Sequence, residues 1–136
     1  MLHFAAARPL PPERPQLIRL PDSGAEAFTT GACDWCLRIR WIMRSPLPDG
    51  LPTADEQAEL DAVERMLVAS LKHAAVLSVV TLHNGVAEWL FYTANPRATT
   101  RRVTALPRPR QAVPLLVESF PDPAWQLYQE AGAQVH

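Results

Sequence analysis

The chain has only two cysteines, almost no net charge and no long apolar run. Two cysteines cannot form a disulfide scaffold, which indicates a reducing compartment. The formal net charge of −1 argues against a dedicated binder of nucleic acid or of anionic membranes, because such proteins need a basic surplus. No apolar run reaches the roughly 20 residues that span a bilayer. The first residues lack a secretory signal pattern, since Arg8 interrupts their apolar stretch, and we expect a cytoplasmic protein.

The composition is that of one ordinary globular domain: 136 residues, of which 48% are apolar and 20% charged. The chain contains 14 prolines, and they crowd the N-terminal segment. Because proline lacks an amide donor and fixes φ, we expect residues 1–30 to form a proline-rich, partly ordered arm. A short edge strand at residues 17–20 is left open. Residues 31–136 are then expected to form a single α+β domain.

The pattern of residues 35–72 predicts a strand followed by a helix. Apolar side chains recur at every second position from Trp35 to Met43, which is typical of a half-buried strand. Thr53 and Glu56 form a capping box, in which each side chain satisfies the backbone amide of the other, and predict a helix over 53–72. Its apolar face carries leucine or valine at spacings of three and four: Leu60, Val63, Leu67 and Leu71.

The second half of the domain predicts a hairpin, a helix, a strand and a short helix. Residues 74–82 and 86–93 are strand-like, and the Asn84-Gly85 pair between them favours a type I′ turn. Asn95 before a proline predicts an N-cap and a helix over 96–106. The remaining elements are an edge strand over 113–120 and a helix that begins at Asp122-Pro123.

The predicted order is therefore strand, helix, strand, strand, helix, strand and a small helix. This is the order of the split βαβ, ferredoxin-like arrangement, which is an α+β fold. We expect a four-stranded antiparallel sheet with two helices on one face and a short C-terminal helix. The opposite face of the sheet is expected to be open.

Several short motifs carry a family resemblance over roughly residues 35–130. The most specific are the turn Asp49-Gly50-Leu51-Pro52, the Glu88-Trp89 pair with Phe91-Tyr92, and Asp122 with Trp125 and Tyr128. In these residues the chain resembles the bacterial family named domain of unknown function 695, whose members usually carry an arginine where this chain has Ala87. That family is similar in fold to the protein regulator of ribonuclease E activity, a ferredoxin-like inhibitor that acts by binding. The resemblance implies the same fold and a binding or regulatory role, with no known activity, cofactor or catalytic residue.

The reactive side chains show no pattern of a metal or catalytic site. Cys33 and Cys36 form a CxxC pair, but the pair leads into a strand, whereas a thioredoxin-like site places it at a helix start. A zinc site needs two more ligands, and the four histidines are scattered along the chain. We therefore expect packed or loosely paired cysteines, whose redox state is left open, with no metal, no cofactor and no catalytic residue.

The expected open face of the sheet carries the candidate binding residues. Glu88 and Tyr92 lie on the same side of the strand over 86–93, which we expect to point away from the helices. The first and third strands are neighbours in the predicted fold, so Arg38 and Arg40 should lie beside Glu88. One interpretation is a cross-strand ion pair worth a few tenths to about 1 kcal/mol. The functional interpretation is a polar recognition patch formed by Arg38, Arg40, Glu88 and Tyr92.

The two predicted helices differ in charge. Residues 97–110 hold five arginines and no acids, whereas residues 53–64 hold five acids and no bases. Because these helices lie side by side in the predicted fold, ion pairs between them are one explanation. The other is a basic patch at Arg97, Arg101 and Arg102 that docks an acidic protein surface.

We expect a small cytoplasmic binding or regulatory module that acts through a protein partner at the open sheet face. A homodimer is left open, whereas a membrane or a nucleic acid is not an expected partner. One alternative is an enzyme whose site is built from scattered residues around Glu88 and Tyr92, in a pocket where Glu88 is desolvated. Another is weak association with RNA through residues 97–110.

Overall fold

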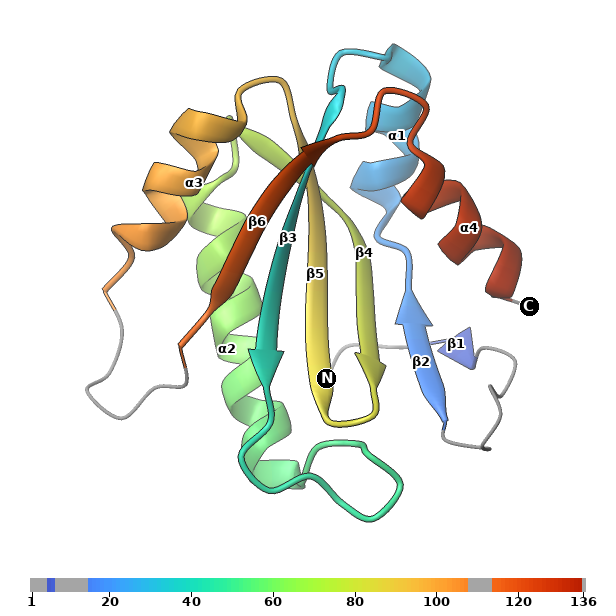
Figure 1. Ribbon diagram of the computed structural model, residues 1–136, viewed down its shortest axis with the longest axis vertical. Coiled ribbons are helices and arrows are strands. Elements are labelled where there is room, and N and C mark those ends of the chain that lie inside the picture. Colours follow the sequence, from blue (N-terminus) through green and yellow to red (C-terminus); the bar gives the residue numbers. More distant parts are fainter. Residues whose placement is uncertain (1–4, 7–14, 108–113, 136) are drawn as a thin grey trace.

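The computed structural model describes residues 5–6, 15–107 and 114–135 and has six strands and four helices in this part of the chain (Figure 1). The strands are β1 (Ala5–Ala6), β2 (Gln16–Arg19), β3 (Trp35–Ile42), β4 (Ala75–His83), β5 (Val86–Thr93) and β6 (Leu116–Pro121). The helices are α1 (Asp22–Thr30), α2 (Ala54–Ser70), α3 (Pro96–Thr104) and α4 (Gln126–Gln134). Within the described residues, no helix is both long and apolar enough to cross a membrane.

All six strands form one antiparallel sheet in the order β1-β2-β4-β5-β3-β6, so the α+β class is confirmed. The four predicted strands are β3, β4, β5 and β6. The prediction of a four-stranded sheet is wrong, because β2 and the short β1 extend it beyond β4. Pro15 and Pro21 flank residues 16–19 without interrupting them, so the backbone of this segment is free to pair with β4 from His83 to Val80.

Residues 16–30, which the proline content assigns to the arm, form β2 and α1. Helix α1 lies against the start of β4, where β2 no longer pairs with it, and the Ser23 hydroxyl donates to the Leu77 carbonyl at 3.1 Å. The close approach depends on Gly24, because a Cβ at this position would lie 2.8 Å from the Ser78 Cα. Residues 1–4 and 7–14 of the predicted arm lie outside the described residues.

The local signals for α2, the hairpin and α3 are confirmed. The Thr53 hydroxyl accepts the amide of Glu56 at 3.2 Å, and the Asn95 side chain accepts the amide of Ala98 at 3.1 Å. Asn84 and Gly85 have φ of 50° and 81°, as a type I′ turn requires. Only the reciprocal half of the capping box is wrong. The Glu56 carboxylate accepts from the indole of Trp41 at 2.8 Å, since packing against the sheet places it there.

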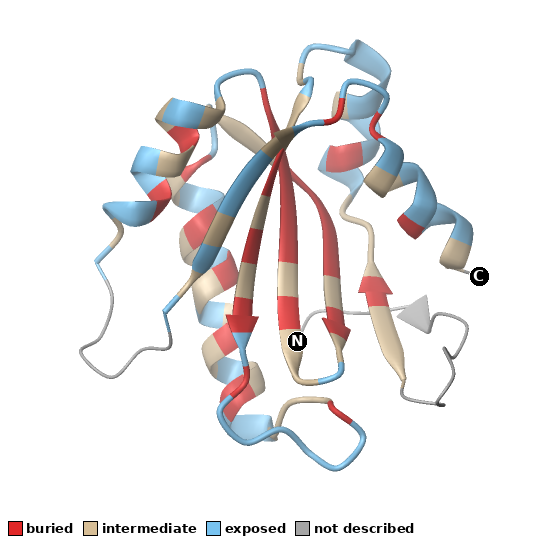
Figure 2. Ribbon diagram, in the orientation of Figure 1, coloured by how far each residue is buried: buried red, intermediate tan, exposed pale blue. Residues whose placement is uncertain are grey.

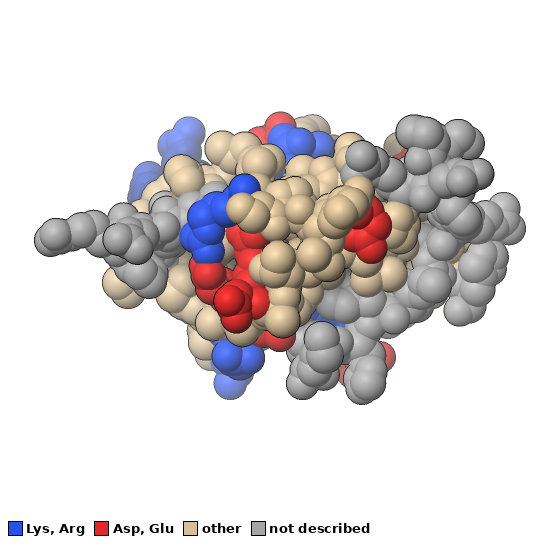
Figure 3. All heavy atoms as spheres, turned by 90° about the horizontal axis from the view of Figure 1, so that it is seen from below, with Lys and Arg blue, Asp and Glu red and all other residues tan. Residues whose placement is uncertain are grey.

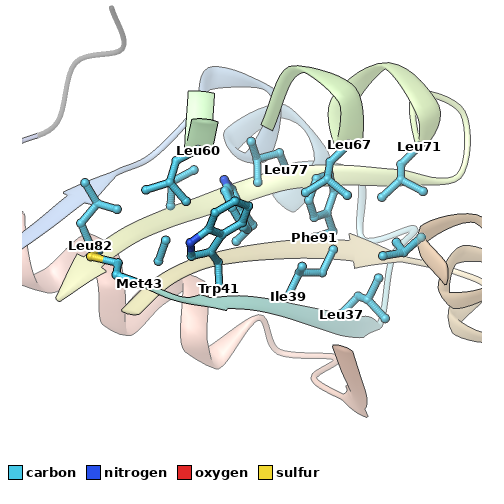
Figure 4. Packing of buried hydrophobic residues seen from close by; sticks show 14 residues of the cluster. Leu37, Ile39, Trp41, Met43, Leu60, Leu67, Leu71, Leu77, Leu82 and Phe91 are labelled. Atoms are coloured by element: carbon cyan, nitrogen blue, oxygen red, sulfur yellow. The ribbon is translucent and has the colours of Figure 1, made fainter. Parts of the chain in front are cut away.

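One face of the sheet, named here the α2 face, packs against α2 and α3. Figure 2 shows the buried residues concentrated on β3, β4, β5 and one side of α2. The leucines of α2 point onto the strands, as Figure 4 shows. The buried residues of this core are Leu37, Ile39, Trp41, Met43, Leu60, Leu67, Leu71, Leu77, Val80, Leu82, Ala87, Trp89, Phe91 and Val103.

The opposite face, named here the α4 face, is not open over its whole area. Residues of α1 and α4 and of the turn before α4 pack against part of it, and Figure 1 shows both helices at the upper right, beside β4. A second core forms there from Ile18, Cys36, Val79, Leu90, Tyr92, Trp125 and Ala131. The expectation of an open face therefore holds only for the part of the face that this core leaves exposed.

Candidate functional site

The exposed part of the α4 face carries two arginines and two glutamates on β3, β5 and β6. Arg38 Nε lies 3.4 Å from Glu88 Oε1, and Arg38 Nη1 lies 3.2 Å from Glu118 Oε1. Arg40 Nη2 lies 3.1 Å from the same oxygen of Glu118. The four side chains form a continuous ion-pair network, named here the charged ladder.

Strand register explains why these four residues meet. Arg40 is opposite Glu88 on β5, and Arg38 is opposite Glu118 on β6. Side chains of directly paired residues lie on the same face of a sheet, so all four point to the α4 face. The prediction that Arg38 and Arg40 lie beside Glu88 is confirmed. Glu118 was not predicted. Side chains alternate between the two faces along the predicted strand over 113–120. Pairing of this strand with β3 then places Glu118 on the same face as Arg38.

The charged ladder is only partly solvated. Burial raises the pKa of Glu88 above its usual range, the charges of Arg38 and Arg40 oppose this shift, and that of Glu118 adds to it. The Nε atoms of both arginines are buried and donate no hydrogen bond to the described residues. The network therefore holds desolvated hydrogen-bonding groups whose capacity is not used within the described fold.

Two apolar side chains border the charged ladder and are exposed to solvent. Ile42 on β3 is 49% exposed and Leu116 on β6 is 48% exposed. Leu116 is opposite Arg40, and Ile42 lies two residues further along β3, so both share the face of the ladder. These two residues and the charged ladder together are named here the ladder face.

A shallow hollow of about 130 Å³ separates the ladder from α4. Arg38 and Glu88 line it on the sheet side, with Thr81 on β4, and Glu130 and Gln134 line it on the helix side. Two carboxylates and one guanidinium therefore meet in it, with apolar carbon from the neighbouring strands. At this volume the hollow is smaller than the roughly 300 Å³ at which small-molecule pockets begin.

The prediction that Tyr92 lies exposed beside Glu88 is wrong, because Tyr92 is fully buried in the core of the α4 face. Its ring stacks on Trp125 with the ring centroids 3.8 Å apart. Its hydroxyl donates to Asp122 Oδ2 at 2.7 Å, and burial, followed by this hydrogen bond, raises the pKa of Tyr92. Glu88 and Tyr92 share a strand face but are separated by four residues, or roughly 13 Å. The structure does not bring them together as an acid–base pair.

Asp122 also holds α4 in place. Its two carboxylate oxygens accept the backbone amides of Gln126 at 2.8 Å and of Leu127 at 3.2 Å. The prediction that the helix begins at Asp122-Pro123 is wrong: the helix begins at Gln126, because Trp125 adopts a left-handed conformation with φ of 54°. This places the Trp125 ring on Tyr92.

The basic patch and the acidic helix do not pair within the described residues. Arg97, Arg101 and Arg102 are exposed on α3, and the Arg102 guanidinium contacts only the Ser70 carbonyl of α2, at 3.4 Å. Seen from the lower end of Figure 1, basic and acidic side chains lie next to each other without a large area of one sign (Figure 3). Arg108 and Arg110 of the predicted arginine run lie outside the described residues.

The acids of α2 have other partners. Glu59 pairs with Arg44, and Glu64 pairs with Arg19 of β2. Glu56 and Glu64 are buried and accept the indole N–H groups of the sheet tryptophans. Glu56 and Glu64 therefore belong to the buried side of α2 and not to its solvated side.

The cysteines are unpaired thiols. Cys36 is fully buried in the core of the α4 face, and this burial raises its pKa to about 12. Burial also raises the pKa of Cys33. Both shifts keep the thiols protonated, which is the opposite of what a reactive cysteine needs. Among the described residues, no group of three or more histidine, cysteine, aspartate or glutamate side chains is arranged to hold a metal.

Comparison with known proteins assigns the chain to a family. Residues 13–131, from the segment before β2 into α4, match a family described as a family of unknown function, DUF695. The chain belongs to DUF695. This membership confirms the family resemblance of the sequence motifs. No curated protein and no solved structure matches the chain.

Proposed function

We propose that this DUF695 chain is a small binding or regulatory module that acts through protein contacts at its ladder face. The main support for this proposal is that Ile42 and Leu116 are each about half exposed beside a partly desolvated ion-pair network. Exposed apolar side chains next to desolvated polar groups are the composition of a protein interface core with its polar rim. The partner that fits is a protein surface with apolar side chains opposite Ile42 and Leu116 and with acceptors for the two arginines.

The charges of the ladder favour recognition over catalysis. Each carboxylate of the network contacts at least one guanidinium, so its charge is already compensated. A partner that supplies acceptor oxygens to the partly exposed guanidinium groups of Arg38 and Arg40, whose side chains are 27% and 39% exposed, gains hydrogen bonds without the cost of uncovering a new charge. The charged ladder therefore determines the orientation and specificity of the partner. Burial of Ile42 and Leu116 supplies the favourable free energy of binding.

The fold supports the same function. We infer a ferredoxin-like topology, because β4-β5-β3-β6 with α2 and α3 on one face is the strand order of a split βαβ unit. The family resemblance of the sequence includes similarity in fold to the protein regulator of ribonuclease E activity, which acts by binding. A cytoplasmic bacterial protein that regulates a partner by contact accords with both inferences.

The test is capture of a partner from nuclease-treated bacterial lysate with three tagged forms of the chain. The wild type and Leu47→Asp should enrich the same protein, whereas the double variant Ile42→Asp/Leu116→Asp should lose it. Leu47 is the matched control because it is an equally exposed leucine, 45% exposed, in the loop before α2. Circular dichroism melts of all three forms check that each is folded.

The affinity for the captured protein, once purified, decides the proposal. The double variant and Arg40→Glu should each weaken binding by about tenfold or more, as is typical when central interface residues are lost. Equal retention of the partner by the double variant, loss of the partner on nuclease treatment, or capture of no protein by the wild type each contradicts the proposal.

A further inference from the structure

A pocket in the described structure lies away from the ladder face, on the α2 side of the sheet. It has a volume of about 320 Å³ and opens between α1, the end of β2 and the C-terminal half of α2. Its apolar lining includes Leu77 and Phe91 of the core, with Val68 of α2 at its exposed rim. This volume falls in the range of small-molecule sites, which begins at about 300 Å³.

The pocket exists because α1 and α2 are held apart. Gly24 brings α1 against the backbone of Ser78, and the Ser23 hydroxyl donates to the Leu77 carbonyl. Both contacts hold α1 at the exposed edge of β4, whereas the leucines of α2 hold that helix over the centre of the sheet. The space between the two helices is therefore set by the separate packing of each helix on the sheet.

The charges around the pocket are unequal. The Glu64 carboxylate pairs with Arg19 and also accepts the indole N–H of Trp89 at 3.1 Å, so its charge is compensated inside the fold. Lys72 follows the end of α2, lines the same pocket and is exposed. It forms no ion pair with any described residue, which leaves one uncompensated positive charge beside an apolar cavity.

We infer that this pocket binds a small monocarboxylate with an apolar body. The apolar part lies against Leu77, Phe91 and Val68, and the carboxylate pairs with Lys72 at the mouth. Burial of the apolar body supplies most of the binding free energy, because each buried methylene contributes about 0.8 kcal/mol. The ammonium group selects an anion over a neutral molecule of the same shape. This site is on the opposite face from the ladder and does not depend on the function proposed for it.

The experiment uses octanoate as the probe and the uncharged 1-octanol as its neutral counterpart. Isothermal titration of the full chain measures affinity, and ¹H–¹⁵N spectra locate the site through the amides of the pocket residues. Octanoate should bind with one saturable site and shift the amides of residues 19–23 and 68–77. Octanol should bind about fivefold or more weakly, which is the loss of one exposed ion pair.

Three variants sharpen the result. Lys72→Gln should weaken octanoate about fivefold and leave octanol unchanged. Arg65→Gln, which removes an equally exposed positive charge from α2 outside the pocket, should leave both affinities unchanged. Val68→Trp, at an exposed position on the rim, should block both probes without unfolding the chain.

The inference is overturned by any of three results. These are failure of octanoate to bind or to shift the pocket amides, equal affinity of octanol and octanoate, and an unchanged octanoate affinity of the Lys72→Gln variant. A loss of binding in Arg65→Gln equal to that in Lys72→Gln also overturns it, because attraction by overall charge then explains the effect. The octanoate affinity of the Ile42→Asp/Leu116→Asp variant should equal that of the wild type. This measurement separates the test of the pocket from the test of the proposed function.

Discussion

The two faces of the sheet are built in different ways. The core of the α2 face comes from elements whose own sequences are periodic, and its leucines recur along one helix. The core of the α4 face is assembled from single residues of distant segments, such as Ile18, Tyr92 and Trp125. The first kind of core can be recognised from short windows of sequence. The second depends on which segments the folded chain brings together.

Both faces nevertheless use a buried carboxylate to position a helix on the sheet. On the α2 face, Glu56 accepts the indole N–H of Trp41 and Glu64 accepts that of Trp89. On the α4 face, Asp122 accepts the Tyr92 hydroxyl and two amides of α4. A buried carboxylate needs several donors to offset its desolvation, so each such residue determines the position of its helix. The comparison predicts that contacts on the α2 face stabilise the whole fold, whereas contacts on the α4 face stabilise mainly the position of α4.

The largest effect is expected on the α2 face. Leu67→Ala should lower the free energy of unfolding by about 3 kcal/mol, because Leu67 is fully buried and its loss leaves a cavity. Urea denaturation followed by circular dichroism measures this. The neighbouring Val68→Ala is the control and should change stability by less than about 0.5 kcal/mol, since Val68 is 43% exposed. Equal losses in the two variants would contradict the described orientation of α2.

A smaller and more local effect is expected on the α4 face. Tyr92→Phe removes the hydroxyl that donates to Asp122 and should cost about 1.5 kcal/mol, because the lost hydrogen bond is to a buried carboxylate. Hydrogen exchange should become faster in α4 and stay unchanged in β3 and β5. Tyr128→Phe is the matched control, since the hydroxyl of Tyr128 makes no hydrogen bond within the described structure. Uniform acceleration over the whole sheet by Tyr92→Phe would remove the distinction between the two faces.

The α4 face should also make stability depend on alkaline pH. Burial raises the pKa of Cys36 from 9.0 to about 12, so between these values the unfolded chain loses this proton while the folded chain keeps it. Stability is then fully present below pH 9 and falls as the pH rises. We expect a loss of about 1 kcal/mol between pH 8 and pH 10, from 1.36 kcal/mol per pKa unit.

Urea midpoints at pH 8 and pH 10 measure this loss. Cys36→Ala should reduce the difference between the two midpoints. Cys33→Ala should retain most of it, because Cys33 is only partly buried. A Cys36→Ala chain with an unchanged pH dependence would show that another group titrates in this range.

The smallest effect on stability is expected in the charged ladder. Arg40→Gln removes a half-exposed ion pair with Glu118 and should cost about 0.5 kcal/mol at low salt and less at 1 M salt. Thermal unfolding at both salt concentrations measures this. Arg65→Gln is the control, as an exposed arginine of α2 with no ion pair among the described residues. A cost above about 2 kcal/mol would indicate a structural role for the ladder in place of a role in recognition.

Sequence reasoning identifies the charged ladder more completely than it identifies its surroundings. The alternation of β3 and β5 and the Asn84-Gly85 turn are sufficient to place Arg38 and Arg40 beside Glu88. The same alternation places Tyr92 on that face, but alternation gives only the side of a strand and not what covers it. Tyr92 is buried because Trp125 adopts a left-handed conformation and stacks on it, which no local pattern indicates.

The sequence by itself determined the elements whose signals lie within a few residues of one another: the cap at Thr53, the hairpin turn, the cap at Asn95 and the alternation along β3. Only the tertiary structure decided that residues of α1 and α4 pack against the α4 face and that Arg19 meets Glu64. The physical reason is the range of the interactions. A cap or a turn satisfies backbone groups of its own segment, whereas contacts such as that of the Trp125 indole with the Cys33 carbonyl join residues 92 positions apart.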